Sequence, residues 1–364
     1  MARFSVCGAR LAGCSVVLGE HRSSIDATPA HYGNDPARLE RLKRVIGMGE
    51  RYTAAAGTTT GDMCLQAATA LLRALACDPG DLGAVVSVTQ TPDYLMPGNA
   101  HILHGRLGCP RETAALDVSL GCSGFVYGLW LSALTAAAAG RAVLLAAGDT
   151  LSKKAGKNDR TTAPLFGDAG SAALILPSPH SHPMYFILRA DGGQFEKMYI
   201  PAGGARRPST TRTRRKFALA DGGSRSVEDV FMDGFGIFSF TMAEQPQLLA
   251  DILEYSGQSV QSIDYCILHQ ANRYIVETIT RKAGIPAEKA PSDAFARFGN
   301  QNSASIPGVL CGTLADALRG RTLRAVLQGY GTGLSWGACQ LALEDCLCLP
   351  PVRYGLSPND SFVQ

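Results

Sequence analysis

The stretch Asp117-Val-Ser-Leu-Gly-Cys-Ser-Gly-Phe125 predicts a short strand that turns sharply into a long apolar helix, with Cys122 in the turn. A cysteine at the N-terminus of a helix lies at the positive end of the helix dipole, which favours the thiolate form. The glycines on either side let another molecule come close to the backbone. The segment makes Cys122 a candidate nucleophile, although a buried structural cysteine gives the same local pattern.

Short apolar runs alternate with longer Ala- and Leu-rich segments on both sides of this turn. The apolar runs predict buried strands, and the longer segments predict helices. The predicted strands are 84–89, 142–147, 265–268 and 325–327, and the predicted helices are 63–76, 124–139, 247–257 and 274–283. Alternation of this kind is typical of an α/β protein with a largely buried sheet.

The chain also repeats itself weakly, at a constant distance along the sequence. Leu82 and Ile263 occupy the same place in two helix–turn–strand segments. Gly148 and Gly329 follow two matching strands and are separated by the same offset as the first pair. This constant offset favours a duplication, although any α/β protein gives some partial matches. The expected parts are two similar α/β halves at about 1–180 and 181–346, and a C-terminal tail at 347–364.

The same offset relates places where chemistry is expected. Cys122 corresponds to Ser303, and the strand end at His269 corresponds to Val88. Ligand sites in open α/β sheets favour the ends of strands and the turns that follow them. In a pseudo-twofold structure, matching turns can meet near the axis, so we expect these segments to share one site.

Two further segments hold polar residues suited to catalysis. LHQAN (268–272) places His269 between a predicted strand and a predicted helix, and FGNQNSAS (298–305) places Asn300 in a Gly-containing turn. A lone histidine in such a place is more often structural, and the second segment alone reads as an ordinary helix N-cap. The cysteine, histidine and asparagine segments together are more specific than any one of them.

Composition places the chain among ordinary globular proteins. Hydrophobic residues make up 46% and charged residues 18% of the chain, a balance without a disorder signature. The net charge of +3 is too small to imply nucleic acid or another polyanion as a partner. The eleven cysteines lack the paired spacing of zinc ligands, so we expect buried thiols in a reducing compartment and no metal. No signal-peptide core or membrane-length apolar run is found, which favours a cytoplasmic protein without a membrane partner.

Five motifs, in order and spacing, resemble β-ketoacyl-acyl-carrier-protein synthase III and its relatives, condensing enzymes of the thiolase superfamily. The motifs are DVSLGCSGF, FGDAGSAA, ILHQAN, FGNQNSAS and GYGTGLSWG, and the resemblance runs from Phe4 to about Leu343. It implies a thiolase fold, in which two duplicated α/β halves form αβαβα layers, and a homodimer. It also implies that Cys122 is the nucleophile and that His269 and Asn300 complete a catalytic triad.

The resemblance implies acyltransferase chemistry, a decarboxylative Claisen condensation. The Cys122 thiolate attacks a thioester and holds the acyl group covalently. A malonyl thioester then loses CO2, and His269 and Asn300 donate hydrogen bonds to the enolate that forms. The backbone N–H groups of Cys122 and Thr332 form the oxyanion hole. The implied substrates are acyl-CoA or acyl-acyl-carrier-protein thioesters, the implied partner is the acyl carrier protein, and no cofactor is bound.

The sequence departs from the family at the substrate entrance. Where the family has an Arg-Thr-Gly-Ile-type run after a tryptophan that binds coenzyme A, this chain reads RVIGMGER from Arg44 to Arg51. Its two tryptophans, Trp130 and Trp336, lie elsewhere. This favours an acyl-carrier-protein donor over coenzyme A, with Arg44 as a candidate docking residue. With the C-terminal tail, the altered entrance favours a specialised lipid, polyketide or secondary-metabolite pathway.

Two basic regions are further candidates for docking an acidic carrier protein. The family often has a basic residue at the second place after HQAN, whereas here Arg273 comes first and Tyr274 second. The segment 203–226 is longer than the resemblance leads us to expect and is rich in arginine, including Arg214 and Arg215. A solvated surface loop is the alternative interpretation. Nucleic acid is a weaker alternative, because aromatic residues do not interleave with the charges.

Candidate residues for the acyl tunnel also come from the resemblance. Phe235 and Phe238 lie in the segment 231–240, which corresponds to the region before the family's tunnel helix. Met96 stands where the family has a bulky residue that caps the tunnel of the partner subunit. Both segments are equally compatible with plain core.

Three other functions remain open at this point. Acyl transfer to an alcohol or amine uses Cys122 in the same way but needs no donors for decarboxylation. Non-decarboxylative condensation of two acyl thioesters needs a base, for which Asp93 is the acid nearest to Met96 in sequence. A non-catalytic partner subunit usually loses the nucleophile or the histidine, and both are present here.

Overall fold

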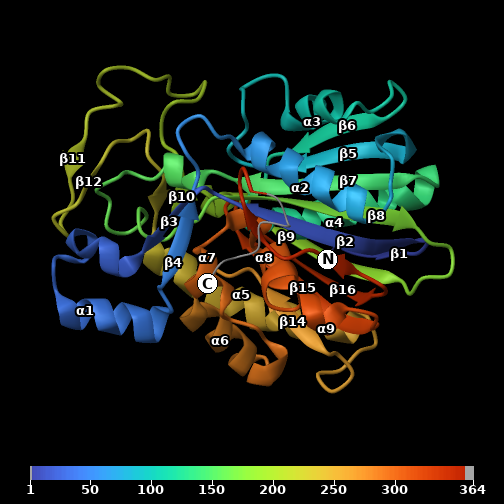
Figure 1. Ribbon diagram of the computed structural model, residues 1–364. Coiled ribbons are helices and arrows are strands. Elements are labelled where there is room, and N and C mark those ends of the chain that lie inside the picture. Colours follow the sequence, from blue (N-terminus) through green and yellow to red (C-terminus); the bar gives the residue numbers. More distant parts are fainter. Residues whose placement is uncertain (1, 357–364) are drawn as a thin grey trace.

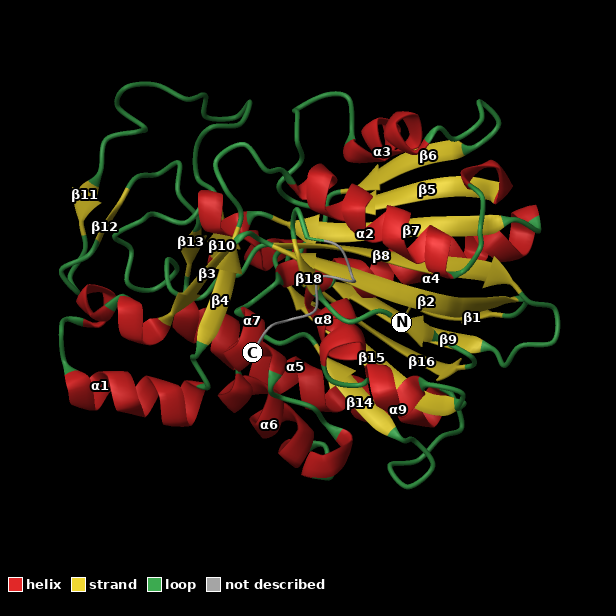
Figure 2. Ribbon diagram, in the orientation of Figure 1, coloured by secondary structure: helices red, strands yellow, loops and turns green. Residues whose placement is uncertain are grey.

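The computed structural model describes residues 2–356, and its core consists of two mixed β-sheets with helices between and outside them (Figures 1 and 2). The first sheet has the order β17 (Leu347–Cys348), β2 (Ala9–Leu18), β8 (Ala169–Pro177), β7 (Ala142–Asp149), β5 (Leu82–Val88) and β6 (Ala114–Val118), with β18 (Val352–Arg353) also paired to β2. The second sheet has the order β1 (Ala2–Val6), β9 (Met184–Ala190), β16 (Ser335–Leu343), β15 (Leu323–Gly331) and β14 (Tyr265–Leu268).

Helices form three layers around the two sheets. The central layer consists of α4 (Gly124–Ala139) and α8 (Ser305–Gly312), which contact strands of both sheets. The outer layers consist of α2 (Thr60–Ala74) and α3 (Asn99–Leu107) on the first sheet, and of α5 (Gly234–Tyr255) and α6 (Arg273–Lys282) on the second. The predicted αβαβα layering of a thiolase fold is therefore confirmed.

The helix sequences explain their layers. Residues of α4 are apolar on nearly every side and include many alanines and glycines, so the helix can lie between two sheets at close distance. Gly128 shows how close this packing is, because a Cβ there would lie 2.7 Å from side-chain atoms of Leu145 and Val88. Helix α6 is instead amphipathic and turns Val276 and Ile279 toward the second sheet.

The two sheets repeat one arrangement of strands. In the first, β5 runs parallel to β7, and β7 and β2 both run antiparallel to β8. In the second, β14 runs parallel to β15, and β15 and β9 both run antiparallel to β16. We call the parts built on these sheets the first half and the second half. This correspondence places the turns before α4 and α8 at matching points.

The chain ends are exchanged between the halves. The N-terminal strand β1 pairs with β9 of the second sheet, and the C-terminal strands β17 and β18 pair with β2 of the first. The sheets therefore cross the divisions expected near residues 180 and 346 at both ends of the chain. Each exchanged segment covers backbone groups that β2 or β9 would otherwise leave unpaired at a sheet edge.

Each half carries an insertion between its antiparallel strand and its outer helix. The first-half insertion contains β3 (His21–Ser24), α1 (Pro36–Arg41), the π-helical turn η3 (Leu42–Ile46) and β4 (Glu50–Thr53). The second-half insertion contains β10 (Met198–Tyr199), β11 (Phe217–Ala218), β12 (Ser224–Arg225) and β13 (Phe231–Met232). Figure 1 shows both insertions at the same side of the molecule, on the left.

Within residues 2–356, no helix has both the length and the apolar character needed to cross a membrane. The same part of the chain contains no group of three or more His, Cys, Asp or Glu side chains arranged to hold a metal ion.

Candidate active site

Cys122 lies in the turn between β6 and α4 and is 7% exposed. Its Sγ is 3.6 Å from Oδ1 of Asn302, which belongs to the second half. Strand β15 passes so close that a Cβ on Gly331 would lie 2.8 Å from Cys122 Cβ. Burial, followed by the charge of Asp149, raises the pKa of Cys122 to about 12. The resting side chain is therefore a thiol and not the thiolate favoured by its place before a helix, because loss of hydration outweighs the helix dipole.

His269 follows β14 and is 2% exposed. Its backbone N–H donates to the carbonyl oxygen of Gln328 at 2.8 Å, and its ring meets the ring of Tyr330 edge to face at 5.4 Å between centroids. Burial lowers the pKa of His269 to about 3, against a smaller opposing effect of a backbone hydrogen bond with Asn302. The imidazole is therefore neutral at physiological pH and carries one ring proton.

Asn300 lies in the turn that follows α7 (Ala294–Phe298). Its backbone is fixed on both sides, since its N–H donates to Leu165 O at 2.9 Å and its carbonyl accepts from Gly167 N at 3.0 Å. Its side-chain Oδ1 accepts the N–H of Asn302 at 3.0 Å. This bond engages the amide oxygen and leaves the NH2 group to donate elsewhere.

One cavity of about 490 Å³ brings the three predicted catalytic residues together. Its other walls are mostly apolar: Ile46, Leu165, Phe166, Met198, Met232, Gly234, Phe235, Ile237, Phe238, Phe240, Thr241, Ala271, Asn272, Tyr274, Ile275, Tyr330 and Gly331. The predicted tunnel residues Phe235 and Phe238 belong to this wall. Phe235 is 82% exposed, and Phe238 stacks on Tyr274 with ring centroids 6.2 Å apart. An apolar, aromatic mouth thus leads to the buried thiol.

Thr332 follows β15 and lies next to the turn of Cys122. Its hydroxyl donates to Gln90 Oε1 at 2.9 Å, and its carbonyl accepts from the Ser335 hydroxyl at 2.7 Å. A Cβ on Gly121 would lie 2.4 Å from the same Gln90 oxygen and 3.6 Å from the Thr332 hydroxyl. Thr332 therefore lies within contact distance of the residue that precedes Cys122.

Met96 lies away from the catalytic cavity. It is 83% exposed, on a loop where Tyr94 and Leu95 are exposed as well. Tyr94 and Leu95 instead line a separate hollow of about 720 Å³, together with Thr59, Lys153 and residues of the second-half insertion.

The predicted docking residues lie in two places. Arg273 donates from Nη2 to the carbonyl oxygens of Lys43 (3.1 Å) and Arg44, which joins α6 to η3 beside the mouth of the cavity. Arg214 and Arg215 are exposed on the second-half insertion. The Arg214 guanidinium donates to the Ser209 hydroxyl at 2.8 Å.

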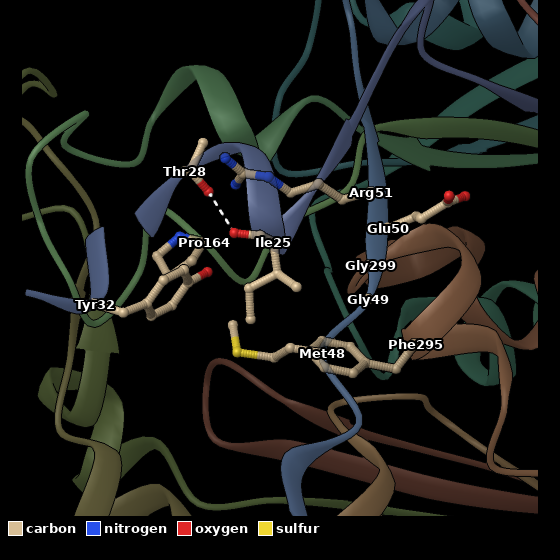
Figure 3. A pocket seen from close by; sticks show the side chains of 10 residues that line it. All are labelled: Ile25, Thr28, Tyr32, Met48, Gly49, Glu50, Arg51, Pro164, Phe295 and Gly299. Atoms are coloured by element: carbon tan, nitrogen blue, oxygen red, sulfur yellow. Dashed lines mark hydrogen bonds between the residues drawn. The ribbon is translucent and has the colours of Figure 1, made fainter. Parts of the chain in front are cut away.

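A smaller pocket is lined by Gly299, the residue that precedes Asn300 (Figure 3). Its volume of about 10 Å³ corresponds to roughly one water molecule. Arg51 lines this pocket and donates to the carbonyl of Ala163, and burial lowers the pKa of Arg51. A Cβ on Gly299 would lie 2.9 Å from Arg51 Cβ, so a glycine is needed there, where φ is +76°.

Three residues of the site were missed by sequence reasoning: Asn302, Asp149 and Tyr330. Asn302 contacts Cys122 and has a φ of +50°, a conformation that asparagine tolerates better than most residues. The Gly-Asn-Gln-Asn pattern is a turn signal that could have indicated it. Asp149 and Tyr330 are themselves related by the offset of the repeat, which therefore contained the signal that strand ends in both halves face the site.

Known proteins support the family suggested by the motifs. Residues 116–192 match the family model described as 3-oxoacyl-[acyl-carrier-protein (ACP)] synthase III, and residues 253–343 match the model of its C-terminal part. A Campylobacter jejuni protein provisionally named 3-oxoacyl-[acyl-carrier-protein] synthase 3 is 33% identical over 339 residues, or 93% of this chain and 94% of that protein. A β-ketoacyl-[acyl-carrier-protein] synthase III of Streptomyces coelicolor is 33% identical over 83% of this chain and 88% of its own length.

Solved structures agree with this result. The crystal structure of a 3-oxoacyl-(acyl-carrier protein) synthase from Burkholderia xenovorans superimposes with a TM-score of 0.89 and 34% identity, and covers 96% of this chain and 98% of that one. The residues matched by the two family models include Cys122, His269 and Asn300. The chain is an acyltransferase that belongs to the 3-oxoacyl-[acyl-carrier-protein] synthase III family.

Proposed function

We propose that this protein forms an acyl thioester on Cys122 and condenses it with a malonyl thioester, releasing CO2 and a β-ketoacyl product. The observation that carries this proposal is the apolar cavity lined by Cys122, His269 and Asn300 together. A neutral histidine and an oriented amide are hydrogen-bond donors without charge, which suits an oxyanion that forms and disappears during one turnover.

Acylation is the first step. The Cys122 sulfur attacks the thioester carbon while its proton passes to the neutral His269. His269 then gives this proton to the departing thiolate, which leaves as a thiol. Because burial disfavours both the thiolate and the imidazolium, proton transfer accompanies formation of the C–S bond. The backbone N–H groups of Cys122 and Thr332 are the proposed donors to the tetrahedral oxyanion.

Condensation follows in the same cavity. The C–C bond to the malonyl carboxylate breaks, CO2 leaves, and the electron pair forms an enolate whose oxygen accepts from His269 and Asn300. The enolate carbon attacks the acyl carbonyl, the C–S bond to Cys122 breaks, and the departing thiolate takes up one proton from solvent as the product leaves, which regenerates the thiol. No proton has to be removed from the malonyl carbon, and the apolar walls keep water from the acyl enzyme.

The surface around the cavity supports a proposal for the donor and for the partner. The mouth is formed by Ile46, Phe235 and Tyr274. None of these three residues is a tryptophan that could stack on the adenine of coenzyme A, or an arginine that could pair with its phosphates. An acyl carrier protein, which brings its thioester on a phosphopantetheine arm, is the proposed donor. The exposed arginines of the second-half insertion, Arg214 and Arg215, are proposed to attract its acidic surface. The departure at the mouth supports a specialised lipid, polyketide or secondary-metabolite pathway.

A homodimer is part of the proposal. The loop of Tyr94, Leu95 and Met96 exposes three large apolar side chains, which is costly for a monomer in water. Met96 is proposed to reach the acyl end of the partner's cavity. Sedimentation of the wild-type protein as a monomer at micromolar concentration would contradict this part.

The decisive experiment is intact-protein mass spectrometry after incubation with a panel of acyl-CoA and acyl-carrier-protein donors, with Cys122→Ala beside the wild type. We expect one donor class to add an acyl mass to the wild type only. A chase with malonyl-carrier-protein is expected to remove the mass and release a β-ketoacyl product. A label that persists through the chase would instead indicate transfer to another acceptor, and no label from any donor would contradict the covalent mechanism.

A further inference from the structure

The carboxyl group of Asp149 lies outside the cavity wall and contacts Ser303, in the turn that carries Asn300. It ends strand β7 and is 1% exposed. Its Oδ1 accepts from Gln90 N at 2.9 Å and from the hydroxyls of Thr89 and Thr91 at 3.2 and 3.3 Å. Its Oδ2 accepts from the Ser303 hydroxyl at 2.6 Å and from Ser303 N at 3.3 Å. Within residues 2–356, no lysine, arginine or histidine forms a salt bridge with it.

The two oxygens of this carboxylate connect opposite sides of the site. On the Oδ2 side, Ser303 directly follows Asn302, which accepts from the Cys122 thiol and donates to Asn300 Oδ1. On the Oδ1 side, Gln90 accepts from the hydroxyl of Thr332. One side chain of the first half thereby fixes the second-half turn that carries the catalytic amide.

A charged carboxylate is the group that fits this place. Five donors converge on two oxygens, and a carboxylate has about four lone-pair sites and no donor of its own. An asparagine would present one oxygen and one NH2, so its NH2 would face donors on one side of the site. Hydrogen bonds to a charged acceptor are also about twice as strong as neutral ones, which offsets part of the cost of burying the charge.

We propose that Asp149 is a positioning residue that holds the turn of Asn300, Asn302 and Ser303 against the Cys122 turn. Its negative charge has a second consequence, since it opposes ionisation of the nearby thiol and helps to keep Cys122 protonated until a substrate enters. The catalytic part of this inference rests on the proposed condensation, whereas the effect on the thiol does not depend on any substrate.

Two variants separate position from charge. Asp149→Asn removes the charge and misplaces the turn, and Ser303→Ala removes one hydrogen bond to the carboxylate but keeps the charge. We expect kcat of Asp149→Asn to fall about 10- to 100-fold, the range for loss of a hydrogen bond to a charged group. Ser303→Ala is expected to lose less, and KM is expected to change little in both.

The second measurement is the rate at which iodoacetamide alkylates Cys122 at several pH values, followed by mass spectrometry. If Asp149 had only a structural role, the pH dependence of this rate would not change in its variants. Asp149→Asn is expected to shift the alkylation profile to lower pH, so the thiol reacts faster while the enzyme turns over more slowly. Ser303→Ala is expected to keep the wild-type profile. His269 and Tyr330, which line the cavity with Cys122, are unchanged in both variants.

A matched control is Asp251→Asn. Asp251 is a buried carboxylate of α5 that pairs with Arg189, away from the cavity wall, so its loss should lower Tm and leave kcat and alkylation unchanged.

The proposal is wrong if Asp149→Asn keeps kcat within roughly twofold of wild type, or if its alkylation profile does not move. Should Asp149→Asn fail to fold, unchanged kcat in Ser303→Ala overturns the positioning role. If no thioester acylates the wild type, the proposed function fails, while the alkylation arm still tests the charge of Asp149.

Discussion

The turn before α4 and the turn before α8 occupy matching places in the two halves, yet they supply different chemistry. The first carries the thiol of Cys122, and the second carries the amide of Asn300, with Ser303 at the position that matches Cys122. The strand ends differ in the same way, since His269 stands where the first half has Val88. The repeated arrangement thus brings two matching turns to one cavity, and sequence divergence gives one of them the proposed nucleophile and the other the proposed donor.

The sharpest way to break this comparison is His269→Val, which gives the second half the residue of the first. The variant keeps Cys122 but loses one enolate donor. We expect the decarboxylative condensation to fall on the order of 10²–10³-fold. The measurement is release of CO2 from a malonyl thioester by the pre-acylated enzyme, because this step does not need a base for the thiol. Condensation within tenfold of wild type would show that Asn300 alone suffices.

The same substitution tests how His269, which has no titrating counterpart at Val88, changes the stability of the protein in acid. The native pKa of His269 is about 3 and its ordinary value is 6.5, so the unfolded state takes up this proton first as pH falls. The contribution of His269 to the free energy of unfolding is therefore fully present above pH 6.5, and it is lost progressively as the pH falls toward 3. Between pH 7 and pH 4 the free energy of unfolding falls by on the order of 3 kcal/mol because of this residue. The His269→Val variant has no group that titrates there, so this part of the pH dependence should be absent from it.

Asp149 acts in the opposite direction. Burial raises its native pKa to about 6 from 3.8, so the native state takes up this proton first as pH falls from 6 toward 4. This partly offsets the effect of His269 in the wild type. Urea unfolding of the wild type, His269→Val and Asp149→Asn at several pH values separates the contributions of the two residues to the free energy of unfolding. Parallel stability curves for wild type and His269→Val would contradict a buried neutral histidine.

Gly148 and Gly329 sharpen the comparison with a smaller effect. A Cβ on Gly329 would lie 2.8 Å from the carbonyl oxygen of Cys122, whereas a Cβ on Gly148 would lie 2.6 Å from the carbonyl oxygen of Ala169. Both alanine variants should therefore be less stable than wild type. Only Gly329→Ala should displace the nucleophile, with acylation slower by roughly tenfold. Equal acylation rates of the two folded variants, measured by rapid-quench mass spectrometry, would refute this distinction.

The two insertions provide the smallest predicted effect. Arg214→Glu/Arg215→Glu in the second-half insertion is expected to raise KM for the acyl carrier protein by about three- to tenfold at low salt and less at high salt. The control with the same change of charge is Arg38→Glu/Arg41→Glu on α1 of the first-half insertion, where both arginines are exposed. An equal rise in both variants would indicate attraction by net charge and not a defined docking surface.

The candidate catalytic segments could be found from local sequence because each signal is short. A strand, a glycine-flanked cysteine and an apolar helix predict the turn of Cys122, and the constant offset of the repeat predicts which strands correspond. The helix 124–139 was predicted with the bounds of α4. The helix predicted at 247–257 begins at Gly234 instead, because Asp233 caps it by accepting Gly236 N, and glycines and Pro246 had concealed its first turns.

Sequence alone therefore determined the fold class, the family and the choice of Cys122, His269 and Asn300 as candidates, because these depend on local pattern and on motif order. Tertiary structure alone decided that Cys122 rests as a thiol and His269 as a neutral ring, because burial, which no local pattern measures, sets both pKa values. It also decided the exchange of β1 and β17 between sheets and the contact of Asp149 with Ser303, in the turn that carries Asn300. Each of these joins residues that lie far apart in the sequence, and only packing brings them into contact.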